Sequence, residues 1–339
     1  MEFGSDFHLC ASSEKGGGLT LPEDAGLYFS GRQALEALVL SQGYKRMWVP
    51  AYYCYESLKR LHQLPIEIKF YDCTPLTNPR EAISGLSYRK GDLLMRMNYF
   101  GLWGFYDSGN IGVDVIEDHS HDLFGPWARK SNAEWCFASL RKTLPIADGG
   151  IIWSPKHLCQ DSQPSKCECN ENAAEQRYLA MKMKADYLSD YSIAKDKFLE
   201  LFHRTEEYFD SSPISAISDI TVKILGDFDC RSWFEAKRRN FKYLFKVLKD
   251  YPDFRILVPE NSKCSPFSLI LLFDSQSKRD YVRKRLIETQ VYPAILWKIP
   301  EGQSPDTVDF GNRMLSIHCD GRYSLKDMEE LASKIIAAL

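Results

Sequence analysis

The chain lacks a hydrophobic stretch long enough to cross a membrane. The longest apolar run, 267–273 (FSLILLF), is interrupted only by Ser268 and falls far short of the roughly 20 residues that a bilayer requires. The N-terminal sequence MEFGSDFHLC also lacks the basic and then apolar pattern of a secretory signal. We therefore expect a cytoplasmic protein with no membrane segment.

The chain also lacks a large excess of charge of one sign. It carries 43 Lys and Arg against 46 Asp and Glu, for a formal net charge of −3. Nucleic-acid-binding domains usually carry a strongly basic surface, so we expect no nucleic-acid partner. The 339 residues are 44% hydrophobic and 26% charged, which excludes a disordered chain and favours a large domain with a smaller one attached.

Cysteine spacing typical of metal sites is scarce. The chain has 10 cysteines, and without a secretory signal they favour reduced thiols over a disulfide framework. Only Cys159, Cys167 and Cys169 are clustered, in the polar stretch CQDSQPSKCECNENA. Their C-x-C spacing differs from the usual C-x-x-C of zinc sites, and no histidine lies nearby in sequence. We expect a mobile surface loop here, with a zinc or iron–sulfur site as the alternative.

The first 155 residues alternate between patterns typical of helices and of strands. Expected helices lie at 31–42 and 56–62, and expected strands at 46–49, 66–71, 93–97, 113–116, 135–140 and 151–153. This alternation predicts a doubly wound α/β domain with a mostly parallel sheet. In such sheets, ligands bind beyond the carboxyl ends of the strands.

The pattern changes at about residue 170. Helical spacing extends over 172–209, 214–225 and 233–248, and the remainder reads strand 268–273, helix 278–289, strand 314–317 and helix 325–339. We expect a large α/β domain at 1–170, long connecting helices at 171–250 and a small C-terminal α+β domain at 251–339.

The segment 113–125 (VDVIEDHSHDLFG) places Asp118 at the end of a hydrophobic strand. A carboxylate in that position is costly to bury unless a cationic group faces it, and a protonated pyridine nitrogen is one such group. Two alternatives remain open. Asp118 could cap the turn that follows, or it could form a metal site with His119 and His121.

The segment 136–153 (CFASLRKTLPIADGGIIW) leads a strand into Ser139 and Lys142 and then into the turn Asp148-Gly149-Gly150. A lysine just beyond a strand end is either solvated or enclosed in a pocket. Enclosure would lower its pKa and make the amine nucleophilic. The paired glycines suit a tight turn or a close approach of backbone.

Six short motifs follow one another along the chain: SGRQAL at 30–35, VPAY at 49–52, NYFG at 98–101, EDHSH at 117–121, Lys142 followed by DGG at 148–150, and SIHCDGRYSLKDMEELASKI at 316–335. Their order resembles that of the DegT/DnrJ/EryC1/StrS family, the sugar-aminotransferase-like branch of fold-type-I pyridoxal-phosphate enzymes. The resemblance covers residues 28–155 well and the rest of the chain loosely.

This resemblance implies the fold-type-I fold and pyridoxal 5′-phosphate as cofactor. Lys142 would form the Schiff base with the cofactor and then move the proton. Asp118 would pair with the pyridinium nitrogen, so that the ring acts as an electron sink. His121 would hydrogen-bond to the phenolic oxygen of the ring.

The same resemblance implies a phosphate site at the start of the first helix. Gly31 and Arg32 would offer backbone N–H groups and Ser139 a hydroxyl, and Arg141 could add charge. The position of the family's ring-stacking aromatic falls near Cys54, so Tyr53 or Tyr55 could take that place, or the ring could pack on a thiol. Trp297 and Lys298 are expected near the substrate. No metal is predicted in the site.

The resemblance implies an aminotransferase that moves an amino group from an amino acid such as glutamate to a keto sugar, nucleotide-linked sugars included. It also implies a homodimer. Two other functions stay open: a pyridoxal-phosphate enzyme of another reaction type (a lyase, a decarboxylase or a non-sugar aminotransferase), and a non-catalytic homologue that keeps the fold for binding or assembly.

Overall fold

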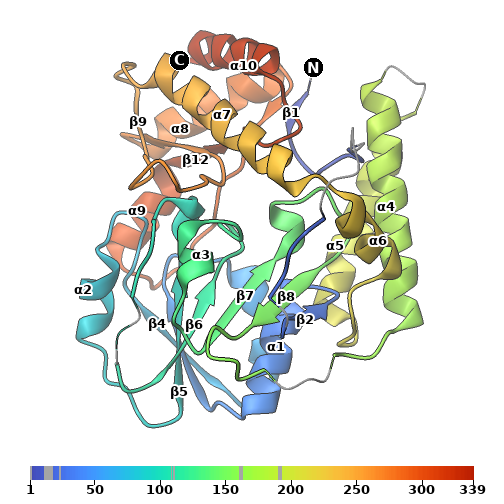
Figure 1. Ribbon diagram of the computed structural model, residues 1–339. Helices are drawn as coiled ribbons and strands as arrows, with labels where there is room; N and C mark the ends of the chain where they lie inside the picture. Colours follow the sequence, from blue (N-terminus) through green and yellow to red (C-terminus); the bar gives the residue numbers. More distant parts are fainter. Residues whose placement is uncertain are drawn as a thin grey trace.

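The computed structural model describes residues 2–10, 18–22, 24–107, 109, 111–159, 163–189 and 193–339. At its centre is a seven-stranded sheet with the order β2-β8-β7-β6-β5-β3-β4 (Figure 1). The strands are β2 (Gly26–Tyr28), β3 (Arg46–Pro50), β4 (Glu67–Tyr71), β5 (Asp92–Met97), β6 (Asp114–Asp118), β7 (Trp135–Ser139) and β8 (Gly150–Trp153). Only β8 pairs antiparallel with its neighbours. The predicted mostly parallel α/β sheet is confirmed.

Short helices connect these strands. They are α1 (Gly31–Gln42), α2 (Pro79–Ser84), α3 (Pro126–Lys130) and the 3-10 turns η1 (Tyr55–Leu58), η2 (Leu61–Gln63), η3 (Tyr99–Gly101) and η4 (Leu140–Lys142). The expected helix at 56–62 is therefore two short turns. Arg60, which lies between them, donates to the main-chain carbonyls of Phe209, Asp210 and Ser212. The local sequence pattern does not predict this contact, because the segment that accepts these hydrogen bonds is distant in the chain.

Four helices follow the sheet: α4 (Glu168–Leu188), α5 (Lys195–Ser211), α6 (Asp219–Asp227) and α7 (Cys230–Leu248). The helical spacing expected over 172–209 corresponds to two separate helices, α4 and α5, whose apolar faces pack together. The helix expected from residue 214 begins only at Asp219. Ala216 bridges to Tyr28 in β2, and the Ser218 side chain caps the helix by accepting from the Thr221 N–H.

The C-terminal part contains a three-stranded antiparallel sheet with the order β12-β10-β9 (Figure 1). Its elements are β9 (Phe254–Ile256), β10 (Leu269–Phe273), α8 (Gln276–Glu288), α9 (Pro305–Arg313), β12 (Met314–Ile317) and α10 (Leu325–Ala338). In addition, β1 (Phe3–Gly4) pairs in parallel with β11 (Val291–Tyr292). The first strand therefore lies with the small C-terminal part, although the sequence-based division groups it with residues 1–170.

All 10 cysteines are unpaired in the structure. Cys167 is the residue that precedes α4, and Cys169 lies exposed in its first turn. The rest of the expected surface loop includes residues 160–162, which lie outside the described residues. Among the helices of the described ranges, none combines the length and the apolar character needed to cross a bilayer.

Candidate active site

Parallel neighbouring strands bring the predicted residues to one edge of the central sheet. Asp118 ends β6, Ser139 ends β7, and Lys142 ends the η4 turn that directly follows β7. One cavity of about 90 Å³ touches every predicted site residue. These residues are Gly31, Arg32, Tyr53, Asp118, His121, Ser139 and Lys142.

Two close backbone approaches fix the start of α1 beside this cavity. A Cβ atom on Gly150 would lie 2.2 Å from the carbonyl carbon of Ser30, and one on Gly31 would lie 3.0 Å from Cβ of Ser139. Gly149 has a φ of +125°, which side chains disfavour. The glycines therefore let β8 and the loop after β7 touch the helix start.

The first turn of α1 leaves a donor facing the cavity. Ser30 caps the helix by accepting from the Gln33 N–H. The N–H of Arg32 has no hydrogen-bond partner in the described part of the chain, whereas the N–H of Gly31 takes part in the parallel bridge between Ser30 and Gly149. Free N–H groups at a helix start, together with the helix dipole, favour an anion.

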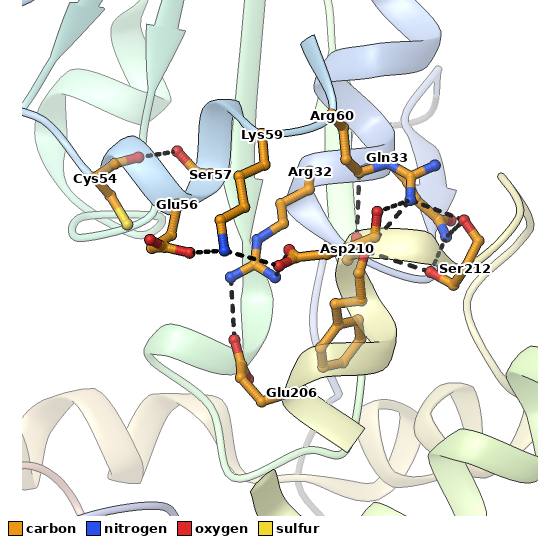
Figure 2. A network of polar contacts seen from close by, with 12 residues as sticks. Arg32, Gln33, Cys54, Glu56, Ser57, Lys59, Arg60, Glu206, Asp210 and Ser212 are labelled. Carbon is orange, nitrogen blue, oxygen red and sulfur yellow. Dashed lines mark hydrogen bonds and ion pairs between the residues drawn. The ribbon is translucent and has the colours of Figure 1, made fainter. Parts of the chain in front are cut away.

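The Arg32 side chain points toward α5 (Figure 2). Its Nη1 lies 2.6 Å from Asp210 Oδ1 and its Nη2 lies 3.1 Å from Glu206 Oε1. Arg141, the predicted source of extra charge, also donates to Glu206, at 2.8 Å. Burial alone would raise the pKa of Glu206, but Arg141 and the neighbouring cations hold it below its ordinary value. The sequence analysis gave no sign of these two α5 carboxylates.

Asp118 is a buried carboxylate that accepts two hydrogen bonds. Its Oδ1 accepts from the Ser120 N–H at 2.8 Å, and its Oδ2 accepts from the Tyr53 hydroxyl at 2.6 Å. Burial raises the pKa of Asp118, and these hydrogen bonds oppose the shift. Tyr53 thus meets the carboxylate through its hydroxyl, which differs from the predicted stacking position.

His121 is held among aromatic rings. Its ring centroid lies 4.2 Å from that of Phe267, and its plane is 12° from that of Trp297. Its Nδ1 lies 3.2 Å from the main-chain nitrogen of Phe100 and accepts that N–H, so Nε2 carries the proton. Burial lowers the pKa of His121 to about 3, and the positive charges of Lys142 and Lys237 add smaller contributions in the same direction. The ring is therefore neutral at physiological pH.

Lys142 has no hydrogen bond or ion pair with any described residue. Its side chain is exposed to the space inside the cavity, and the residues that line the cavity surround it. Removal from bulk water lowers the pKa of Lys142, and the positive charge of Arg141 adds a smaller contribution in the same direction. The arrangement matches the enclosed alternative of the sequence analysis, and a lowered pKa makes the amine a better nucleophile.

A second cavity, of about 270 Å³, adjoins the first. The two share Arg141, Lys142, Phe267 and Leu296, so Lys142 lies where they meet. Trp297 lines the first cavity, as expected, but Lys298 lines neither of the two. The sequence analysis did not single out Phe267, because it belongs to the apolar run 267–273 and directly precedes the strand expected at 268–273.

His119 faces away from Asp118 and His121. Its Nδ1 lies 2.8 Å from Asp122 Oδ1 and its Nε2 lies 3.1 Å from Glu117 Oε2. The metal site considered for Asp118, His119 and His121 is therefore not assembled. Glu117, His119 and Cys136 do bring ligand atoms within 4.8 Å of one another, but both ring nitrogens of His119 are already engaged.

No family model and no curated protein matches the sequence. Solved structures with the same fold do match. One is the aminotransferase TlmJ from Streptoalloteichus hindustanus, with 14% identity, coverage of 93% of this chain and 86% of that chain, and a TM-score of 0.62. Another is NtdA from Bacillus subtilis with bound cofactor PMP, with 10% identity, coverage of 93% and 73%, and a TM-score of 0.61.

A third match is DesI, solved in the presence of its TDP-sugar product. It shares 14% identity, with coverage of 93% of this chain and 80% of that chain, and the TM-score is 0.59. The matches extend over nearly the whole chain, central sheet and C-terminal part together. The chain therefore has the fold of these aminotransferases, and the predicted fold-type-I architecture is confirmed.

Proposed function

We propose that the chain is a pyridoxal-phosphate-dependent aminotransferase of the DegT/DnrJ/EryC1/StrS type. It would move an amino group from an amino acid such as glutamate to a keto sugar. The observation that carries the proposal is that Lys142 and Asp118, far apart in sequence, line one cavity beside the start of α1. The names of the structural neighbours, which include aminotransferases and a protein solved with a TDP-sugar product, support it.

The residues of the cavity fit this cofactor. A carboxylate oxygen has two acceptor sites, so Asp118 Oδ2 can accept from a pyridinium N–H as well as from Tyr53. The free N–H group of Arg32, at the start of α1, suits a phosphate. The Ser139 hydroxyl has no hydrogen-bond partner among the residues described, so it is also available to a phosphate. The Lys142 amine is likewise uncommitted.

Pyridoxal phosphate, when bound, supplies a protonated ring that takes up the electron pair left when a substrate carbon loses a proton. Asp118 would keep that ring nitrogen protonated through a buried, charge-assisted hydrogen bond. Lys142, with its lowered pKa, would take the proton from the substrate carbon and return it. His121 would donate its Nε2–H to the ring oxygen, while Phe267 and Trp297 would limit access of water.

The test is spectroscopic and chemical. The purified protein with added cofactor should be yellow, and borohydride should leave the cofactor covalently attached to the peptide that contains Lys142, as mass spectrometry would show. Lys142→Met should carry no label, and Lys59→Met, which changes an exposed lysine, should be labelled like the parent. Glutamate should bleach the yellow colour.

Two results would redirect the proposal. A protein that stays colourless with added pyridoxal phosphate would favour the non-catalytic homologue. A yellow protein that no amino donor bleaches would favour another reaction type.

We also infer that the protein is a homodimer in the cytoplasm. The homodimer follows from the family resemblance, and the location from the sequence pattern together with 10 unpaired thiols. Sedimentation at several protein concentrations tests the dimer, and a monomer that turns over substrate would refute it.

A further inference from the structure

Lys237 on α7 is a buried lysine without a counterion. It is 2% exposed, whereas Arg239, two residues along the same helix, is exposed. Lys237 makes no hydrogen bond or ion pair with a residue in the described ranges. Its Nζ lies 5.5 Å from the ring centroid of Phe234 and 5.6 Å from that of Phe267. Burial of an unpaired charge is costly, so a purely structural role does not account for this position.

The side chain lines the larger cavity, the one of about 270 Å³ that Lys142 also lines. The basic residues around this cavity are Arg141, Lys142, Arg177, Lys237, His318 and Arg322, and the acidic ones are Asp6 and Asp320. Each acidic side chain pairs with an arginine of the same cavity. Asp320 accepts two hydrogen bonds of 2.9 Å from Arg322, and Asp6 lies 3.2 Å from Arg177. Burial lowers the pKa of His318 to about 4, so this ring is neutral, and Arg141 pairs with Glu206. Lys142 and Lys237 are therefore left without an ion-pair partner among the described residues, and they give the cavity its surplus of positive charge.

Lys237 keeps its charge near neutral pH. Burial lowers its pKa to about 8, and the nearby Cys319, Asp320 and Asp122 oppose that shift. The amine is thus mostly protonated at pH 7 and available to an anion. Phe267 lines both cavities and contacts both Lys237 and His121, so an anion on Lys237 would lie close to the site around Lys142.

The size of the cavity favours a compact ligand. Its volume of about 270 Å³ is close to the lower end of the range for small-molecule sites, roughly 300–1,000 Å³. A small acid or a sugar phosphate suits such a space better than a nucleotide-linked sugar does.

We propose that Lys237 binds an anionic group, a carboxylate or a phosphate, of the substrate that occupies the cavity beside Lys142. This inference deepens the proposed function. Anion binding by Lys237 does not depend on that function, but the statement that the anion belongs to the substrate rests on it. The ammonium group would donate charge-assisted hydrogen bonds to the anion and thereby favour acidic over neutral substrates.

Isothermal titration calorimetry in the presence of saturating pyridoxal phosphate, which would occupy the anion site at the start of α1, tests the inference without any turnover. The two probes are 2-oxoglutarate and inorganic phosphate. Lys237→Met should weaken binding of the preferred probe by about tenfold or more, because a hydrogen bond to a charged group is lost. Lys237→Arg should retain part of the affinity. Lys242→Met, an exposed position on the same helix, should bind like the parent.

The two probes identify the anion. Loss of 2-oxoglutarate binding alone assigns a carboxylate, and loss of phosphate binding alone assigns a phosphate. Equal affinity in the parent and in Lys237→Met, or no binding of either probe to the parent, would overturn the inference. Lys237→Gln is a second neutral variant, and urea unfolding of both checks that they fold. A failure of the proposed function would instead appear as a protein that stays colourless with pyridoxal phosphate, whatever the titrations show.

Discussion

Tyr53 and Asp118 form a buried hydrogen bond, with 2.6 Å between Tyr53 Oη and Asp118 Oδ2. Tyr53 follows β3 in the chain and Asp118 ends β6, so the bond spans two strand ends of the central sheet. Each side chain is buried, at 1% and 4% exposure. The hydroxyl therefore offsets part of the cost of burying the carboxylate and fixes its orientation.

We predict that Tyr53→Phe lowers the unfolding free energy by about 1–3 kcal/mol, because the buried Asp118 carboxylate loses a donor. Urea unfolding in the absence of cofactor measures this change. Tyr243→Phe is the matched control, since the hydroxyl of Tyr243 has no partner within the described ranges. Equal stability of the two variants would mean that the hydrogen bond contributes nothing.

The close approach of the Gly150 backbone to Ser30 predicts that one added methyl group strongly lowers the unfolding free energy. In Gly150→Ala the new Cβ would lie 2.2 Å from the carbonyl carbon of Ser30, so β8 or the start of α1 must move. We expect a loss of about 4 kcal/mol or more, measured by urea unfolding. We also expect weaker binding of pyridoxal phosphate.

Gly85→Ala is the control for this methyl group. A Cβ on Gly85 would meet no atom within 4 Å, and its φ is −101°, which alanine adopts readily. Its stability should change by less than about 0.5 kcal/mol. A similarly small change in Gly150→Ala would show that the helix start is not fixed by this contact.

The lowered pKa of His121 predicts a pH-dependent stability. Because the folded chain holds this ring neutral down to about pH 3, while the unfolded chain binds a proton below 6.5, the folded state loses stability as the pH falls below 6.5. Relative to His121→Gln, the parent should lose about 2 kcal/mol between pH 7 and pH 5.

Urea unfolding of the parent and of His121→Gln at both pH values measures this difference. His62→Gln is the control, because its side chain is exposed in the folded chain as well as in the unfolded chain. We expect its difference from the parent to be the same at pH 7 and pH 5. If the difference in unfolding free energy between His121→Gln and the parent is the same at pH 7 and pH 5, the His121 ring is not held neutral in the folded chain.

Glu206 is expected to restrain two arginines beside the first cavity. Among the described residues, Glu206→Gln leaves Arg141 without an ion-pair partner, Arg32 with Asp210 alone and Arg177 with Asp6 alone. Inorganic phosphate should then bind several-fold more tightly, as measured by calorimetry, because the positive charge beside the start of α1 is less compensated. The stability cost should be only about 1 kcal/mol, since the carboxylate is 39% exposed and screened by solvent.

Glu207→Gln, the adjacent position on α5, is the control for Glu206→Gln. Within the described ranges, Glu207 forms an ion pair with His203 alone, and its side chain is 72% exposed. The Glu207→Gln variant should bind inorganic phosphate with the same affinity as the parent. An unchanged affinity in Glu206→Gln as well would show that neither guanidinium group contributes to anion binding at this site.

Local sequence patterns predicted most strands in their succession along the chain and the residues that follow their carboxyl ends. Hydrophobic periodicity is a local property, so most strands and α1 appear at the predicted positions. Parallel strands present their carboxyl ends at one edge, so Asp118, Ser139 and Lys142 could be expected to meet. The glycines at 149 and 150 also signalled a close backbone approach before its partner, the start of α1, was known.

The surroundings of those residues depend on how distant segments of the chain pack together. The orientation of Tyr53 toward Asp118, the α5 carboxylates on Arg32 and Arg141, and the burial of Lys237 all join segments distant in the chain. The pairing of β1 with β11 is of the same kind. A local pattern predicts which face of an element is apolar. It does not predict which distant side chain will lie against that face, because the packing of the whole chain decides which charges are paired and which remain free.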